Sequence, residues 1–489
     1  FRLLRIIIFA RMQHVKTVIK KHWPKLTIVL WLLLQLPFLT ADLPDSLSYS
    51  RGPYSDEGLN TFAIRNFINS DFQEFSESDN FIKSPVLNLY LFAPFAAFQN
   101  DLLVGRIAML LLVAFLFWQI IKRVKYGWIL VLLFSLTPIL FHFSRLMMGD
   151  LTSVLIPLVG LVIYSSWVNE QKEVGIKKFT LLVLFTSLAV GVKIQGIALF
   201  GIFLVSAFLI PLSGLNRIKR FYGLIIGSLP VFFLFLFVIL KQTELFDYIY
   251  NQVPEYYQAK KYTLVEVFNF NWGLHFQSAQ GRFLVLVWAM IGFFLLTLAA
   301  KFWWKKLLML LPFLVIWLYE FSGMFMIYFP PRYAVGLYAA SFVLLVILVN
   351  ESRYILEVIP KFASIFLAIV LLTYTGKALK EDFGNRQFRL IEMNKRVAQD
   401  DNVSVLIGSW APSLNFTSKR QLAFPIWDSY LIFKEIDKPI EYYNADLIVA
   451  EHDEGDSGGA YKKRGVDLSQ YLVTDSIEVS RFSLFIHVK

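Results

Sequence analysis

Residues 102–121 read LLVGRIAMLLLVAFLFWQII, and the basic run KRVK follows at 122–125. Arg106 is the only charged residue of the first stretch, which has the length of about 20 residues that a helix needs to cross a bilayer. Positive charges directly after such a helix are typical of its cytoplasmic end. The stretch therefore predicts a transmembrane helix that is followed by a cytoplasmic loop.

Similar apolar runs recur through most of the chain. Of its 489 residues, 57% are hydrophobic and only 17% are charged, whereas soluble domains have about 45–50% apolar and about 25% charged residues. This excess of apolar residues predicts an all-α polytopic membrane protein with about eleven transmembrane helices. Besides 102–121, the predicted spans are 25–41, 127–144, 150–168, 178–193, 195–213, 221–240, 282–300, 306–328, 333–349 and 355–375.

The basic residues predict the orientation of these spans. The segment before residue 25 contains no acidic residue and is expected to stay in the cytoplasm. The run from Pro85 to Phe98 is short and contains Pro94, so we expect a helix that lies at the outer membrane interface without crossing. The net charge of +11 then falls mainly on cytoplasmic loops, which argues against nucleic acid as a partner. These basic loops are 122–125, 172–178, 217–220, 301–306 and Arg353.

The predicted topology divides the chain into three parts. Residues 1–24 form a basic cytoplasmic or interfacial segment, residues 25–375 a transmembrane domain, and residues 376–489 a small extracytoplasmic α/β domain. In the last part we expect an amphipathic helix over 385–399 and short strands near 403–408, 447–450 and 483–488. The other regions predicted outside are the first external loop 42–101, the turns near 145–150 and 329–332, and the loop 241–281.

Acidic residues on the predicted outer side are candidates for catalysis. By residue type alone, Asp56 and Glu57 suit a solvated loop, but a carboxylate at the membrane surface could also accept a proton from an acceptor hydroxyl. Asp150 begins an apolar run and could cap that helix. Because the predicted topology puts Asp56 and Asp150 on one side, the pair could also hold a divalent metal ion or an acceptor.

Basic residues on the same side are candidates for binding a phosphate. Lys83 precedes the interfacial run, and Arg332 precedes a predicted span; each could anchor the chain at the interface or contact a lipid phosphate. Lys193 in a tight turn and Glu320 in the outer part of a span are further substrate-binding candidates, because ionisable residues at such depth more often face a cavity than lipid. His275 is expected to be structural, since no His cluster has the spacing of a metal site.

The order and spacing of several short motifs resemble those of the GT-C superfamily of membrane glycosyltransferases. The resemblance extends from residue 25 to about residue 350 and is greatest to the protein O-mannosyltransferases and the lipid A aminoarabinose transferase. The motifs are Asp56-Glu57 in the first external loop, Lys83-Ser-Pro85 before a short helix, Gly105-Arg106, Ser144-Arg145 with Gly149-Asp150, Val192-Lys-Ile-Gln-Gly196 and Pro331-Arg-Tyr333.

This resemblance implies an activity and roles for five of the candidates. It implies transfer of a monosaccharide from a polyprenyl-phosphate carrier to an extracytoplasmic glycolipid, polysaccharide or protein, in the plasma (inner) membrane of a bacterium. Asp56 would be the catalytic carboxylate with Glu57 beside it, and Asp150 the second acidic position. Lys83 would contact the carrier phosphate, with Arg332 as a second contact. The motif Lys83-Ser-Pro85 departs from the His-Pro-Pro of many members, which leaves the substrate class open.

Two alternatives are another kind of enzyme and a transporter. A ligase or polymerase that uses polyprenyl diphosphate glycans would be expected to carry Arg and His residues in a large late external loop, and residues 241–281 are not rich in them. A flippase-type transporter would be expected to have broken helices in two related halves, and the chain shows no clear internal repeat.

Overall fold

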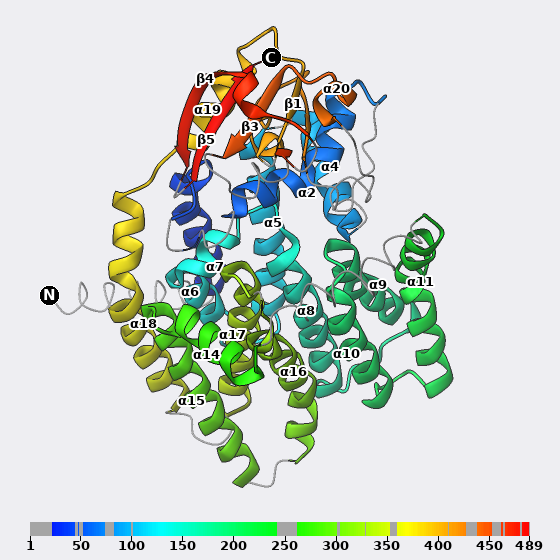
Figure 1. Cartoon of the computed structure of the whole chain (residues 1–489). Helices are drawn as coiled ribbons and strands as arrows, with labels where there is room; N and C mark the ends of the chain where they lie inside the picture. Colours follow the sequence, from blue (N-terminus) through cyan, green and yellow to red (C-terminus); the bar gives the residue numbers. More distant parts are fainter. Residues whose placement is uncertain are drawn as a thin grey trace, which may run out of the picture.

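The computed structural model shows a mostly helical protein with one small β-sheet at one end (Figure 1). Several sequence predictions fall outside the residues that it describes: the basic segment up to residue 21, Lys301, Arg353 and positions 242–261 of the loop 241–281. The described residues are 22–44, 47, 52–73, 83–98, 101–241, 262–300, 304–327, 329–352, 359–408, 410–426, 438–451, 461–462, 465–479 and 482–488.

Six helical stretches in this part of the chain are long and apolar enough to cross a membrane, as expected of a membrane protein. The predicted number of about eleven spans is not confirmed. The six lie in α5 (Leu102–Ile121), α8 (Gly149–Asn169), α11 (Arg217–Lys241), α15 (Ala279–Ala300), α16 (Trp304–Ser322) with the following η4 (Gly323–Phe325), and α17 (Pro331–Ser352).

The other predicted spans contain shorter, interrupted or displaced helices. The predicted span 127–144 is broken at Thr137, which is extended because Pro138 disfavours a helical residue before it. The first predicted span is a helix over 22–35 that ends in η1 (Leu36–Phe38). The remaining helices of this group are α6 (Trp128–Leu136), α7 (Pro138–Phe143), α9 (Ile176–Val192), α10 (Gly196–Leu209) and α18 (Ile359–Gly384).

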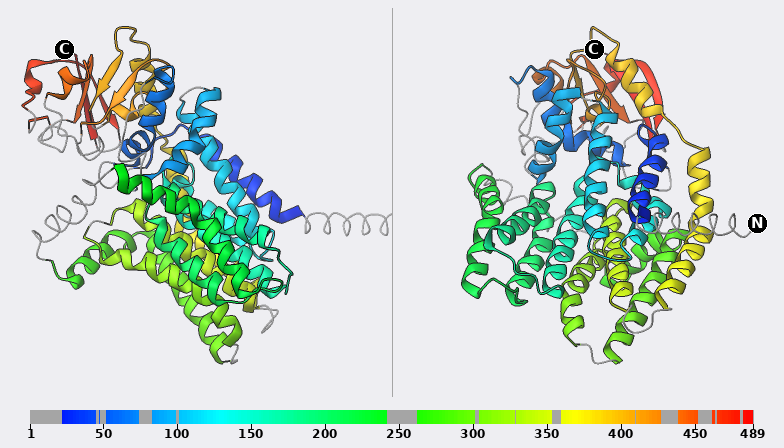
Figure 2. Two further views of the ribbon diagram at one scale, coloured as in Figure 1. Left: turned by 90° about the vertical axis from the view of Figure 1, so that its right-hand side faces the viewer. Right: turned by 180° about the vertical axis from the view of Figure 1, so that it is seen from behind.

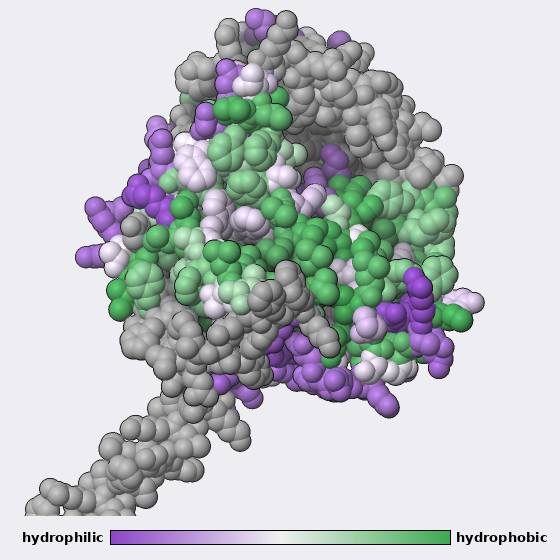
Figure 3. Space-filling view, turned by 90° about the horizontal axis from the view of Figure 1, so that it is seen from below, coloured by the Kyte–Doolittle hydropathy of each residue, from purple (hydrophilic) through white to green (hydrophobic). Residues whose placement is uncertain are grey.

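The helical part is built around α8 and α17. Most residues of these two helices are buried, whereas most of α11 is exposed, and α17 packs against α8, α15 and α16. Apolar side chains cover much of the helical part when it is viewed from the side away from the sheet (Figure 3). An exposed apolar surface of this extent is expected where helices face lipid.

The predicted first external loop contains two helices, of which one was predicted from the sequence. The helix α4 (Pro85–Phe98) confirms the helix expected there. The helix α2 (Gly52–Asn69) was missed, so the description of Asp56 and Glu57 as residues of a solvated loop is wrong. Polar residues in a sequence suggest an exposed loop, but several of those in α2 are buried against other parts of the protein. These are Glu57, Thr61, Arg65 and Asn66.

The C-terminal part folds into a mixed five-stranded sheet in the order β2-β1-β3-β5-β4. Strands β2, β1 and β3 are parallel, and β5 pairs antiparallel with β3 and β4. The predicted amphipathic helix is α19 (Arg389–Ala398), and the three predicted strands are β1 (Val405–Ile407), β3 (Leu447–Glu451) and β5 (Phe482–Val488). The elements not predicted from the sequence are β2 (Leu422–Phe424), β4 (Leu472–Val479) and the short helices α20 (Pro439–Tyr442), η5 (Ala411–Ser413) and η7 (Leu468–Gln470).

The helix α2 is bound to the edge of this sheet, as three views of the ribbon show (Figures 1 and 2). The side-chain amide of Asn66 imitates a neighbouring strand: it donates to the Ala423 carbonyl of β2 at 3.0 Å and accepts from the Ala423 amide at 3.1 Å. The buried Arg65 donates to Asn415 and to the Pro412 carbonyl, and burial lowers its pKa to about 9. The C-terminal domain therefore fixes the helix that carries Asp56.

Candidate functional site

Six of the predicted site residues come together from six separate segments. Asp56 lies on α2 and forms an ion pair with Arg332 at the start of α17, while Asp150 on α8 pairs with Lys193 in the turn between α9 and α10. Tyr333 lies between the two pairs: its ring centroid is 4.9 Å from Lys193 Nζ and 5.0 Å from the Arg332 guanidinium. The remaining two residues, Glu320 and Lys83, adjoin these ion pairs.

Glu320 and Lys83 are placed beside Lys193 by close packing. The Glu320 carboxylate interacts electrostatically with Lys193 and Asp150. It fits against α17 only because residue 336 is glycine, where an added Cβ would lie 2.0 Å from Glu320 Oε2. The Lys83 carbonyl accepts a 3.0 Å hydrogen bond from the Ile194 amide, so the backbone at Lys83 adjoins the Lys193 turn.

Asp150 does not cap α8 as the sequence suggested. Met148 is the N-cap residue, and Asp150 lies within the first turn, where the helix dipole favours a negative charge. The preceding Gly149 allows the Lys193 turn to approach, because a Cβ there would lie 2.5 Å from the Val192 carbonyl oxygen. Two of the sequence motifs, Gly149-Asp150 and Val192-Lys193, are thus in direct contact.

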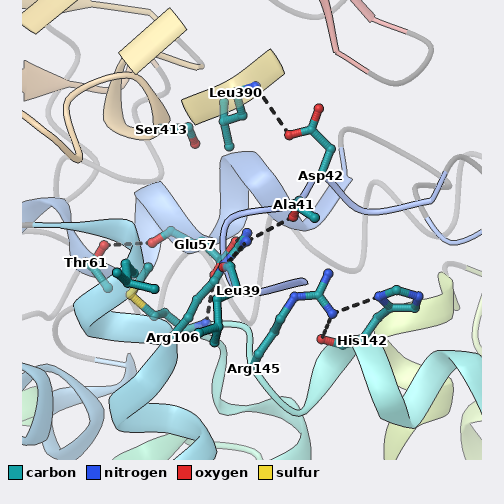
Figure 4. A network of polar contacts seen from close by, with 12 residues as sticks. Leu39, Ala41, Asp42, Glu57, Thr61, Arg106, His142, Arg145, Leu390 and Ser413 are labelled. Carbon is teal, nitrogen blue, oxygen red and sulfur yellow. Dashed lines mark hydrogen bonds and ion pairs between the residues drawn. The ribbon is translucent and has the colours of Figure 1, made fainter. Parts of the chain in front are cut away.

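Glu57 pairs with Arg106 (Figure 4), whereas its neighbour Asp56 pairs with Arg332. Its carboxylate is fully buried and accepts from Arg106 Nε at 3.0 Å, Arg106 Nη2 at 2.6 Å and the Met147 amide at 3.0 Å. Arg106 also donates to the carbonyls of Leu39 and Ala41. Since both oxygens of Glu57 accept strong hydrogen bonds, its geometry suits a positioning role, and the catalytic role assigned to it stays a prediction.

The motif Gly105-Arg106 is explained by this ion pair. A Cβ on Gly105 would lie 2.0 Å from Met147 Sδ, so the glycine allows the α7–α8 turn to approach α5. The sequence indicated the motif but no function for Arg106. The sequence feature that pointed to a function was a single charge within an otherwise apolar run, because a buried charge requires a partner of opposite charge.

A second buried polar chain was also missed. Arg145 Nη1 lies 2.8 Å from His142 Nδ1, and His142 Nε2 lies 3.0 Å from Asp382 Oδ2 on α18. His275, in contrast, is structural as expected: it lies 2.6 Å from the Phe329 carbonyl, and burial lowers its pKa. This contact supports the Pro-Pro-Arg turn that carries Arg332.

The arrangement of the carboxylates does not fit the shared metal site that Asp56 and Asp150 suggested. Each of them faces a basic side chain, Arg332 or Lys193, rather than the other carboxylate. Within the described residues, no group of three or more His, Asp or Glu side chains is placed to hold a metal ion.

An apolar groove of about 300 Å³ begins beside the charged cluster. Its wall includes Pro85 and Val86, which are separated from Lys83 by Ser84 alone, and Gly191, which precedes the Lys193 turn. The exposed helix α11 forms the opposite wall with Pro230, Val231, Phe233 and Leu234. The site therefore combines a charged cluster with an adjoining apolar groove. No family model and no curated protein matches this chain.

Proposed function

We propose that the protein is a membrane glycosyltransferase that transfers a monosaccharide from a polyprenyl-phosphate carrier to the hydroxyl group of an extracytoplasmic acceptor. The observation that carries this proposal is the charged cluster beside an apolar groove. A polyprenyl-phosphate sugar has the matching chemistry: an isoprenoid chain for the groove, a phosphate for the basic residues and a sugar beyond it.

The charge of the cluster favours a phosphate monoanion over a diphosphate. The basic residues Lys83, Lys193 and Arg332 are balanced by the acidic Asp56, Asp150 and Glu320. A polyprenyl-phosphate sugar is a phosphodiester with one negative charge, and a single anion can be bound by shifting the existing ion pairs. A diphosphate carrier would bring a second negative charge and would require more of these ion pairs to be displaced, so the cluster favours the monophosphate donor over the ligase or polymerase alternative.

Asp56 is the proposed general base. The donor phosphate would compete with Asp56 for Arg332 and so release the carboxylate for the acceptor. Asp56 then takes the proton of the acceptor hydroxyl, whose oxygen forms a bond to the anomeric carbon as the bond from that carbon to the phosphate oxygen breaks. The polyprenyl phosphate leaves with the electron pair of the broken bond as a stabilised anion, held by Arg332 and Lys83, so that no strong general acid is needed.

The proposal places the charged cluster and the C-terminal domain outside the cytoplasm, and we expect cysteine labelling to show this. The chain contains no Cys, so single cysteines can be introduced at the exposed Asp401 and Glu173. Asp401→Cys should react with a membrane-impermeant thiol reagent in intact cells, whereas Glu173→Cys should react only after lysis. The reverse pattern would contradict the proposed side.

We expect Lys83→Ala to raise the KM for the polyprenyl-phosphate sugar by about 10- to 100-fold. This is the effect of losing a charge-assisted contact worth roughly 1.5–3 kcal/mol. Lys83→Arg should retain part of the affinity. The matched control is Lys172→Ala, which removes a basic residue from an exposed ion pair with Glu170. An unchanged donor KM in Lys83→Ala would leave Lys83 as an interfacial anchor only.

A further inference from the structure

A second cavity, of about 410 Å³, lies away from the charged cluster, between the residues after η1, the helix α7 and the end of α18. Its volume falls within the range of about 300–1,000 Å³ that is typical of small-molecule sites. None of the candidate residues of the sequence analysis lines it. Its polar lining includes Asp42, His142, Glu381, Asp382, Asn385 and Gln387.

The polar chain behind this cavity fixes the orientation of Asp382. Arginine can only donate, so His142 Nδ1 must accept from Arg145, and its Nε2–H must donate to Asp382 Oδ2. His142 is fully buried, whereas the Asp382 side chain remains 15% exposed. The histidine therefore holds one carboxylate oxygen and leaves Asp382 at the cavity surface in a defined orientation.

Asp42, another residue of the lining, is also held in a defined orientation. The Asp42 carboxylate accepts hydrogen bonds from the Arg389 and Leu390 amides at 3.0 and 3.3 Å, at the start of α19. The one basic side chain of the lining, Arg386, donates to the carbonyls of Phe383 and Pro37. The cavity is thus formed jointly by the helical part and the C-terminal domain.

The lining identifies the chemistry of the ligand. Three carboxylates, of Asp42, Glu381 and Asp382, outnumber the single Arg386, so an anionic ligand such as a phosphate is disfavoured. Carboxylates and the amides of Asn385 and Gln387 are groups that bind hydroxyls by hydrogen bonding. A sugar that is neutral or carries an amine matches this lining.

The cavity is coupled to the proposed active site through Arg106. This residue donates to the carbonyls of Leu39 and Ala41, next to the cavity residues Phe38 and Asp42, and it also holds Glu57 beside Asp56 (Figure 4). We infer that the cavity is a saccharide-binding subsite on the acceptor side of the enzyme. Its role in acceptor binding rests on the proposed function, whereas the binding of sugar does not.

The test is saturation-transfer NMR of the purified full chain in detergent, without donor. The probes are methyl glucoside, glucosamine and glucose 1-phosphate. We expect the first two to bind and the phosphate to bind least. Asn385→Trp, at an exposed position of the cavity wall, should weaken binding about tenfold or more. The matched control Asn402→Trp, at an exposed position of the same domain outside the lining, should bind as the wild type does.

Two outcomes would overturn the proposal. One is equal binding of methyl glucoside by Asn385→Trp and Asn402→Trp, and the other is preferential binding of glucose 1-phosphate at this cavity. Transfer assays separate this result from the proposed function. If Asn385→Trp loses sugar binding yet transfers with an unchanged acceptor KM, the acceptor role is refuted while glycosyl transfer stands. If sugar binds as expected but the wild type transfers nothing, the proposed function fails and the binding site stands.

Discussion

Asp56→Asn is expected to slow glycosyl transfer by about 10²- to 10⁴-fold, which is the usual contribution of a general base. Asparagine keeps the size of the side chain but can neither take the hydroxyl proton nor form an ion pair with Arg332. The Asp56 side chain is 18% exposed, so the change should leave the fold intact. The measurement is the rate of transfer by purified variants that elute as a single species in detergent.

Two further variants show whether the effect is specific to Asp56. Asp150→Asn breaks the pair with Lys193 and should reduce the rate less, because Asp150 does not contact the acceptor in the proposed mechanism. Asp475→Asn, which removes a carboxylate from the exposed pair with Arg396, is the matched control and should transfer normally. If well-folded Asp56→Asn retains full activity, Asp56 is not the base.

Glu57→Gln should destabilise the protein by about 3–5 kcal/mol, the usual cost of removing one partner from a buried ion pair. The glutamine would leave the Arg106 charge buried without a counter-ion and would weaken the junction of α2, α5 and the α7–α8 turn. Thermal unfolding of the detergent-solubilised protein, followed by tryptophan fluorescence, measures the loss.

The double variant Glu57→Gln with Arg106→Met provides the control for this prediction. Removing both charges eliminates the buried unpaired cation, so the double variant should be more stable than Glu57→Gln alone. An unfolding transition of Glu57→Gln at the wild-type temperature would show that the pair contributes nothing to stability.

Those parts of the fold that depend on local patterns could be predicted from the sequence. The apolar runs predicted α5, α8, α15 and α17 closely, because their length and composition suffice to mark them. The same rule overestimated the number of spans, since a run such as 127–144 is interrupted by Pro138. Composition does not reveal where a run is broken or shortened by packing.

The helix α2 and the edge strand β2 could not be predicted because they stabilise each other. Asn66 appears hydrophilic in the sequence, and its burial is favourable only because the Ala423 backbone lies beside it. The two residues are separated by more than three hundred positions in the chain. Neither segment carries a local pattern that shows this pairing.

The candidate residues were found by type and predicted side, but their pairing was not. Asp56 was matched with Asp150 in the sequence analysis, whereas the structure pairs it with Arg332 and pairs Asp150 with Lys193. The close packing that brings these residues together depends on Gly149 and Gly336. The sequence does not show which segment packs against each glycine. The role of Arg106 was missed for the same reason, since its partner Glu57 lies on a helix that the sequence did not predict.

The most direct test of the central claim is transfer by the purified wild-type chain from a radiolabelled polyprenyl-phosphate monosaccharide to a lipid or glycan fraction of cell envelopes. The account predicts that labelled acceptor and free polyprenyl phosphate form in equal amounts, that Asp56→Asn forms both about 10²- to 10⁴-fold more slowly, and that a polyprenyl diphosphate sugar does not replace the donor. Movement of the intact donor across the bilayer without cleavage, or transfer from the diphosphate donor alone, would contradict it.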